Sequence, residues 1–517
     1  MMNKQDILSA REEMKEFKEK TDAFYAGDMD KGSYKSFSGR FGSYAQRGGT
    51  ANMLRLRMTA GRLTKEKLRF IAEMIEQHQV KRAHFTTCQT VQLHDLSGQD
   101  AYEIMVKALD AGINTLGGGG DFPRNVMCSP LSGVEQGEYF DVLPYAEAAG
   151  EYLMTLIHAQ KMPRKLKVAF SNSPKNSTHA TYRDLGFVAC PDGTFDVYSA
   201  GGLGNNPRMG VRVAQGVAPS SILYYIKAMW LTFLAYGNYE SRAKARTRYM
   251  QEALGGADNY IQAYRQKLEE VFASGENLEL SVTPVLVKKG GDQSHAEGFR
   301  VIPQKQEGLY SVLYHPIGGQ PDPSWFSRIS DTIRDMEEVE LRLSPDETVY
   351  IINLTGSEAQ KVLDATADGA NTLFETSVSC IGSSICQVGA RDSQALLSAC
   401  VKAVREAGLP DSALPQIHIS GCTSSCGTHQ TGAIGFHGTV KLVDKVPQPA
   451  FFLHINGKEG QEDALFGTQL GVILEKDIPS FLIAVGTAAA ASGQPFGQWN
   501  SAHPGALEEI AAQYLAN

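Results

Sequence analysis

Hydrophobic and basic residues alternate over residues 54–58 (LRLRM), which is the pattern of a half-buried β-strand. Ala60 and Gly61 follow as a turn, and the apolar spacing then changes to that of a helix over residues 65–77. Residues 85–93 return to strand periodicity. The first part of the chain therefore predicts a small α/β module.

A similar order of elements recurs from Leu309 onward. The pattern predicts a strand, a Gly-Gly turn, a helix and two further strands, over residues 309–315, 318–319, 325–336, 339–344 and 348–354. This recurrence indicates an internal duplication of one α/β module. Each copy is followed by a longer mixed segment, so the simplest organisation is four lobes in two pseudo-equivalent halves.

We therefore expect an α+β fold with two pseudo-repeated halves, each made of a small α/β module and a larger mixed α/β lobe. A charge-dense N-terminus predicts an amphipathic surface helix, and the Gly-, Ser- and Tyr-rich residues 27–50 predict a loop. The expected boundaries are residues 1–50 for this extension, 51–116 and 117–280 for the first half, and 281–371 and 372–517 for the second.

Composition narrows the class of protein. A chain of 517 residues is too long for one ordinary core, and 42% apolar and 21% charged residues are usual for a globular protein. No run approaches the ~18 apolar residues that a membrane span needs, and the N-terminus lacks the apolar stretch of a secretory signal. The net charge of −8 argues against nucleic-acid binding. We expect a cytoplasmic protein without a nucleic-acid or membrane partner.

Three short segments allow two interpretations. The basic run Arg242, Lys244, Arg246 and Arg248 favours a solvated helix face over a docking surface for an acidic partner. The glycine-rich residues 117–120 and 200–206 lack the spacing of a dinucleotide fingerprint. They predict either turns or backbone amides that approach an anionic ligand.

The cysteines carry the strongest chemical signal. Cys380 and Cys386 form a C-x5-C pair, and Cys422 and Cys426 form a C-x3-C pair after 35 intervening residues. Four thiolates in two close pairs hold either a tetrahedral zinc ion or an iron–sulfur cubane. Paired zinc ligands are usually two to four residues apart, so the longer spacing favours the cubane. Cys400 lies in a helical pattern and is expected in the core.

This cysteine pattern, in the last third of a chain of this size, resembles the sirohaem-dependent sulfite and nitrite reductase family. The resemblance covers the chain from about Asn52 onward and implies ferredoxin-like modules, sirohaem-binding lobes, and a [4Fe-4S] cluster on Cys380, Cys386, Cys422 and Cys426. It also implies that Cys426 bridges to the sirohaem iron.

Several N-terminal segments resemble the family's substrate and cofactor motifs. The segments MLRLR, PRNVMC and PRKLK imply that Arg55, Arg124, Lys165 and Lys167 bind the substrate. The implied cofactor contacts are Arg57, Gln89, Gln92, His94, Arg164, Gly201 and Gly202. Taken singly, an arginine on a strand face or a PRKLK segment more often belongs to a solvated surface, but their order upstream of the cysteine pairs favours a site.

The chemistry explains these residue types. Sulfite and nitrite are anions, so fixed cations offset their desolvation, and lysine also donates protons during a reduction that consumes them. In the family, two lysines in the PRKLK-like motif mark sulfite reductases, and nitrite reductases more often carry Asn at the second position. Lys167 therefore favours sulfite reduction to sulfide, with nitrite reduction to ammonium as the alternative. A non-catalytic zinc protein is the alternative from another class.

Two departures from the family pattern stand out. Cys88 occupies a position where the family commonly has Arg, and Thr423 and Ser424 replace Pro and Asn in the second cysteine pair. No flavin or nicotinamide motif is apparent. A separate electron donor, such as ferredoxin or a flavoprotein, is therefore expected.

Overall fold

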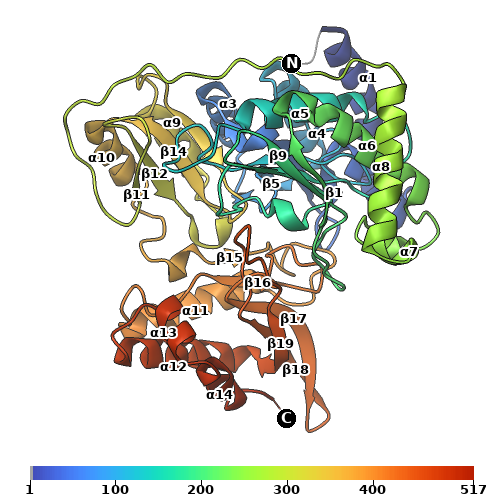
Figure 1. Cartoon of the computed structure of the whole chain (residues 1–517). Helices are drawn as coiled ribbons and strands as arrows, with labels where there is room; N and C mark the ends of the chain where they lie inside the picture. Colours follow the sequence, from blue (N-terminus) through green and yellow to red (C-terminus); the bar gives the residue numbers. More distant parts are fainter. Residues whose placement is uncertain (1–3, 517) are drawn as a thin grey trace.

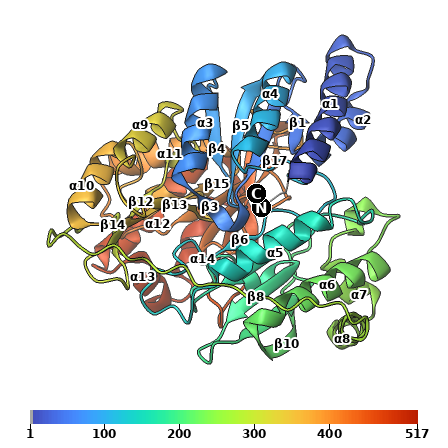
Figure 2. The ribbon, with the colours of Figure 1, turned by 90° about the horizontal axis from the view of Figure 1, so that it is seen from above.

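The computed structural model describes residues 4–516 and arranges them around four β-sheets. Module 1 is the antiparallel sheet β1-β2-β5-β4, formed by β1 (Ser43–Ala45), β2 (Asn52–Arg57), β4 (Arg82–Phe85) and β5 (Thr90–Leu96). Its helices are α3 (Lys65–Gln77) and α4 (Gly98–Asp110), and α1 (Lys4–Ala26) packs along α4 (Figure 2). Alternating apolar positions bury one face of each strand against these helices.

Module 2 repeats this arrangement in the order β11-β12-β14-β13-β3. It contains β11 (Val301–Pro303), β12 (Tyr310–Tyr314), β13 (Glu340–Leu343), β14 (Val349–Leu354), α9 (Ser324–Thr332) and α10 (Gly356–Ala365). Its edge strand β3 (Arg62–Leu63) comes from module 1. Phe85 of module 1 also packs against the ring of Trp325, with centroids 5.6 Å apart. The two modules therefore share one hydrophobic core.

Lobe 1 is the sheet β10-β9-β8-β7-β6, in which β6, β7 and β8 are parallel. Its strands are β6 (Met127–Cys128), β7 (Val168–Ser171), β8 (Leu185–Ala189), β9 (Phe195–Ser199) and β10 (Val211–Val217). Its helices are α5 (Leu143–Thr155), α6 (Ile222–Tyr236), α7 (Tyr249–Ala253) and α8 (Ala257–Ala273). A long segment then crosses to module 2 (Figure 1) and contains the expected boundary at residues 280 and 281.

Lobe 2 has the same pattern in the sheet β15-β16-β17-β18-β19, where β15, β16 and β17 are parallel. The strands are β15 (Val378–Ser379), β16 (Ile417–Ser420), β17 (Ile434–Val443), β18 (Val446–Ile455) and β19 (Thr468–Leu474). The helices are α11 (Ser393–Ala407), α12 (Ile478–Ala491), α13 (Phe496–Ala502) and α14 (Ala506–Ala512). The expected α+β fold with two pseudo-repeated halves is confirmed (Figure 1).

The duplication extends to the backbone of the connecting loops. Residues 172–184 join β7 to β8, and residues 421–433 join β16 to β17 with the same length. A Cβ atom at Gly186 would overlap the carbonyl oxygen of Ala180, and one at Gly435 would overlap that of His429. In each lobe a glycine in the strand therefore lets the preceding loop lie directly on the sheet.

Three expectations about local structure were wrong. The predicted strand over residues 85–93 is a hairpin, because Gln89 adopts a φ of 53° and turns the chain between β4 and β5. The predicted loop over residues 27–50 contains α2 (Lys31–Ser38), whose first backbone amides are capped by Asp30, as well as β1. The helix predicted over residues 325–336 ends at Thr332.

Within residues 4–516, no helix is both long enough and apolar enough to span a bilayer.

The glycine contact in lobe 1 gives a stability test. Replacement Gly186→Ala should lower the free energy of unfolding by at least ~2 kcal/mol, because the added methyl group overlaps a backbone carbonyl that cannot move independently. Gly497→Ala in α13 (Phe496–Ala502) is the control, since a Cβ there has open space, and it should leave stability unchanged or raise it by up to about 1 kcal/mol. Chemical denaturation measures the free energy of unfolding of both variants. Equal values for Gly186→Ala and Gly497→Ala would contradict the packing described at Gly186.

Candidate functional site

The four paired cysteines come together where lobe 2 meets the rest of the molecule. Cys380 directly follows β15, Cys386 lies in the loop before α11, and Cys422 and Cys426 lie in the loop between β16 and β17. Burial raises the pKa of Cys380 to about 12, and the neighbouring Cys426 adds to the shift. Burial also raises the pKa of Cys426, where Lys165 opposes the effect of Cys422 and Cys386. Thiolates crowded in this way need a cationic metal centre.

The donor set fits a [4Fe-4S] cluster better than a zinc ion. Around one zinc, sulfurs lie about 3.8 Å apart, from Zn–S bonds of about 2.3 Å. Among the described residues, one group brings three or more possible ligand atoms within 4.8 Å of one another, and that group consists of histidines. No three of the cysteine sulfurs therefore lie as close together as zinc would need. The Gly421 amide donates to Cys380 Sγ at 3.1 Å, and Ser393 Oγ lies 3.2 Å from it. Such contacts to sulfur tune a cluster's potential.

The N-terminal part of the chain holds the cysteine loops from the other side. Arg47 donates to the carbonyl oxygens of Cys386 and Gly389 at 3.1 and 2.7 Å, and its own amide donates to Ile385 O at 2.9 Å. In the β4–β5 turn, Thr87 Oγ1 donates to Cys426 O at 2.8 Å. The two halves of the chain therefore meet at the cysteines.

A group of cations lies opposite Cys426. We call Arg55, Arg124, Lys165 and Lys167 the cation pocket. Burial and the charges of Arg246, Lys167 and Arg124 hold the pKa of Lys165 well below its usual value, whereas Cys426 opposes the shift. Burial lowers the pKa of Arg124 to about 10. Cations enclosed together are costly without anions, so this arrangement fits the carboxylates of a sirohaem and an anionic substrate.

The Gly117–Gly120 loop positions the two pocket arginines. Arg55 donates to Gly118 O at 2.5 Å, and Arg124 donates to Gly118 O and Gly120 O at 2.8 and 3.0 Å. When the Gln92 amide is oriented with its oxygen toward Arg55, that oxygen accepts a hydrogen bond from the Arg55 guanidinium at 2.6 Å. The glycines act here through carbonyl oxygens that accept from the arginines.

Some of the expected cofactor contacts are engaged elsewhere. Arg57 is buried and donates to Leu116 O, Pro123 O and Arg124 O. Gln89 is buried and hydrogen-bonds to the backbone of Cys128 and Leu343. A Cβ at Gly201 would press on the backbone of Tyr182. These residues support the surrounding backbone.

All of the expected cofactor contacts, including Arg57, Gln89 and Gly201, stay predictions. Burial holds the pKa of His94 well below normal, and its Nε2 is buried with no hydrogen-bond partner among the described residues. Arg164 forms a 2.6 Å ion pair with Asp121. Gly202 faces the side chain of Arg248, 3.6 Å from a Cβ placed there.

Two arginines near the cation pocket were not found by motif comparison. Arg246 forms a 3.1 Å ion pair with the buried Asp184 and acts on both pocket lysines. It belongs to the basic run expected on a solvated helix, but only Arg242 and Lys244 are largely exposed. Arg183 is buried beside Cys88. Its only signal in the sequence is an isolated basic residue before β8.

Cys88 changes the charge of the pocket. Burial alone would raise its pKa, but the positive charges of Lys167, Arg183 and Arg55 lower it to about 6. These charges favour the thiolate form of Cys88, which hydrogen-bonds to Lys167. Where an arginine would add a positive charge, this residue adds a negative one.

Together, a cysteine quartet suited to an iron–sulfur cluster and a half-buried cation pocket on a duplicated α+β fold are the features expected of an iron–sulfur oxidoreductase acting on an anion. The family model "Nitrite and sulphite reductase 4Fe-4S domain" matches residues 119–272, and "Nitrite/Sulfite reductase ferredoxin-like half domain" matches residues 44–111. The two matched parts of the chain are similar to the nitrite and sulfite reductase family, and these matches imply a sirohaem and a [4Fe-4S] cluster as cofactors.

Individual relatives agree with this assignment. Ferredoxin–nitrite reductase of Synechococcus elongatus is 26% identical, over 83% of this chain and 84% of its own. Sulfite reductase [ferredoxin] 1 of Mycolicibacterium paratuberculosis is 23% identical, over 81% of this chain and 75% of its own. The solved structure of the Mycobacterium tuberculosis NirA protein shares the fold with a TM-score of 0.78, at 23% identity over 96% of both chains.

The cysteine assignment can be tested by iron content. Cys422→Ser should lower iron from about five per chain, four in the cluster and one in the macrocycle, to about one or less, with loss of acid-labile sulfide. Cys190→Ser, outside the quartet, is the control and should retain the full content. A Cys422→Ser protein with unchanged iron would refute the ligand set.

Cys88 predicts a pH-dependent substrate affinity. Above pH 6 its thiolate offsets the charge of Lys167, so Cys88→Ser should lower the KM for sulfite or nitrite about three- to tenfold at pH 7.5. Below pH 6 the thiol is neutral and the two enzymes should have similar KM values. Steady-state kinetics across this pH range test the prediction, with Cys190→Ser as the control. A ratio of the wild-type KM to the Cys88→Ser KM that does not change with pH would rule out the charge effect.

Proposed function

We propose that this chain reduces sulfite to sulfide at a sirohaem coupled to the [4Fe-4S] cluster. The single observation that supports this most is the position of two half-buried lysines, Lys165 and Lys167, opposite the Cys426 thiol. When bound, the sirohaem and its cluster supply the electrons and an iron coordination position for the substrate. The residues of the cation pocket supply the rest.

The cation pocket would bind and orient the substrate. Arg55 and Arg124 are held in place by the Gly118 carbonyl, so their remaining N–H groups have a fixed direction. Preorganised donors of this kind need little rearrangement as negative charge builds on the substrate oxygens. The two ammonium groups add positive charge, which attracts a sulfite dianion more strongly than a nitrite monoanion.

The same lysines would deliver protons. Reduction of bisulfite to hydrosulfide consumes six electrons and six protons and releases three waters. Burial and neighbouring cations lower the pKa of Lys165 and of Lys167, which makes each ammonium a stronger acid than a solvated lysine. Arginine retains its proton, so Arg55 and Arg124 act by charge and orientation.

Ferredoxin is the proposed electron donor, because relatives bear the names ferredoxin–nitrite reductase and sulfite reductase [ferredoxin]. Because the net charge is −8, a docking surface for an acidic carrier must be a local patch of basic residues. The exposed Arg242 and Lys244 are candidates, although both form ion pairs with acidic neighbours.

Nitrite reduction to ammonium is the second candidate. The Cys88 thiolate removes much of the charge that Lys167 brings, and this suits a monoanion. Several relatives, including those of Synechococcus elongatus and Arabidopsis thaliana, are named ferredoxin–nitrite reductase.

The deciding experiment compares kcat/KM for sulfite and nitrite with one reduced ferredoxin or artificial donor. A preference for sulfite of tenfold or more supports the proposal. A clear preference for nitrite overturns it in favour of the second candidate, with the same cofactors and the same cation pocket.

Lys167 should set the preference between the two anions. Lys167→Asn removes the second ammonium group, so kcat/KM for sulfite should fall at least tenfold while that for nitrite changes less. Lys175→Asn, whose side chain is 72% exposed, is the matched control and should leave both values unchanged. Equal losses for the two substrates would show that Lys167 does not discriminate between them.

A further inference from the structure

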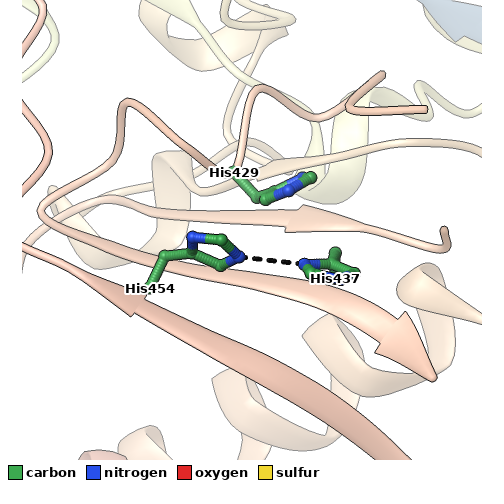
Figure 3. Close-up of side chains that lie close together, drawn as sticks. All are labelled: His429, His437 and His454. Carbon is green, nitrogen blue, oxygen red and sulfur yellow. Dashed lines mark hydrogen bonds between the residues drawn. The ribbon is translucent and has the colours of Figure 1, made fainter. Parts of the chain in front are cut away.

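Three histidines of lobe 2 gather at a position that the proposed reaction does not use. His429 precedes β17, His437 lies on β17 and His454 lies on β18. One ring nitrogen of each lies within 4.8 Å of the other two, and His437 Nδ1 lies 2.9 Å from His454 Nε2. Figure 3 shows the three rings converging from two strands and the preceding loop.

The fold brings the three rings together by sheet register. His437 pairs with Phe452, and Gly435 pairs with His454, so His437 and His454 are diagonal neighbours on one face of the β17–β18 ladder. Gly435 has no side chain on that face, so the backbone of His429 lies in the space that a Cβ would take. Phe452 stacks on the His437 ring with centroids 4.9 Å apart. The arrangement is therefore held by packing on several sides.

The electrostatic surroundings favour neutral rings. Burial lowers the pKa of all three histidines, to about 4 for His437 and His454. Within the described residues, no carboxylate forms an ion pair with any of them. Three neutral imidazoles present three lone pairs, which is the form in which histidine binds metals.

A second contact orients one ring. Ser420 Oγ lies 3.0 Å from His429 Nδ1 and accepts the amide of Gly427 at 3.0 Å. Metal-bound histidines usually hold their second nitrogen in such a hydrogen bond, which leaves the first directed at the ion. Here Nε2 of His429 is the nitrogen left available.

We propose that His429, His437 and His454 bind one divalent transition-metal ion of the zinc type, separate from the iron–sulfur cluster. Three imidazoles are a common ligand set for such ions, with water as the fourth ligand. Metal binding releases no proton from the site. The proton in the hydrogen bond between His437 Nδ1 and His454 Nε2 moves to the other ring nitrogen of the same histidine, which leaves both of these atoms free to bind the ion. The side chains are nearly buried, but His437 and His454 remain 7% and 6% exposed, which leaves a path to solvent.

The ion would connect the cluster loop to the sheet behind it. His429 follows Cys426 in the same loop, and Ser420 lies two residues before Cys422. Bound metal at the three histidines would therefore fix the loop that carries half of the cysteine ligands to β17 and β18. The site is structural in this assignment and lies outside the path of the substrate.

Zinc content of the holoenzyme tests the site. The protein is treated with a mild chelator that leaves its iron unchanged, dialysed against Zn²⁺, desalted and analysed for zinc and iron. About one zinc per chain is expected in the wild type, with at least a tenfold weaker affinity in His437→Gln and in His454→Gln. His158→Gln, with a side chain 53% exposed, is the control and should bind zinc as the wild type does.

A spectroscopic measurement covers the case in which a variant fails to fold. X-ray absorption at the zinc edge of the wild type should show nitrogen ligands at about 2.0–2.1 Å. Sulfur ligands at about 2.3 Å would place the zinc on cysteines and overturn the proposal. The absence of retained zinc, or equal zinc in His454→Gln and the wild type, would overturn it as well.

Discussion

The closeness of half-buried cations to the Cys426 thiol is the constraint on which the rest of the site depends. Lys165 belongs to lobe 1 and Cys426 to lobe 2, and each shifts the other's pKa in the direction expected for opposite charges. Several positive charges gathered this closely repel one another, so they favour binding of an anion beside them. The cations would hold the carboxylates of a sirohaem, and the four thiolates would hold the iron–sulfur cluster.

The duplication explains how one site receives such different ligands. The loop at residues 421–433 carries Cys422 and Cys426, and Ser173 and Ser177 occupy the equivalent places in the loop at residues 172–184. Ser129 likewise follows β6 as Cys380 follows β15. In lobe 1 two of these serines hydrogen-bond to each other, since Ser177 Oγ donates to Ser129 Oγ at 3.2 Å. The same backbone thus closes on itself in one half and offers sulfur ligands in the other.

The N-terminal segment and Cys88 adapt this frame. Arg47 joins the segment after β1 to the loop of Cys386, and Gln387 of that loop donates to the carbonyl oxygen of Ala45 in β1 at 2.8 Å. Cys88 lies in the β4–β5 turn next to Thr87, which contacts Cys426. Its negative charge among Lys167, Arg183 and Arg55 separates this pocket from one that carries an arginine there. Differences of charge at one turn are enough to alter the affinity for small anions.

The sequence by itself determined the order of the elements, the duplication and the cysteine quartet, because periodicity and ligand spacing are properties of residues close together in the chain. The helix at residues 65–77 was predicted with its observed bounds. The hairpin at Gln89 escaped prediction, since a φ of 53° without glycine is imposed by contacts with Cys128 and Leu343. The inward direction of Arg246, the charge of Cys88 and the meeting of His429, His437 and His454 were decided only by the tertiary structure. Each depends on groups that are distant in sequence, and electrostatic and packing forces act on distance in space.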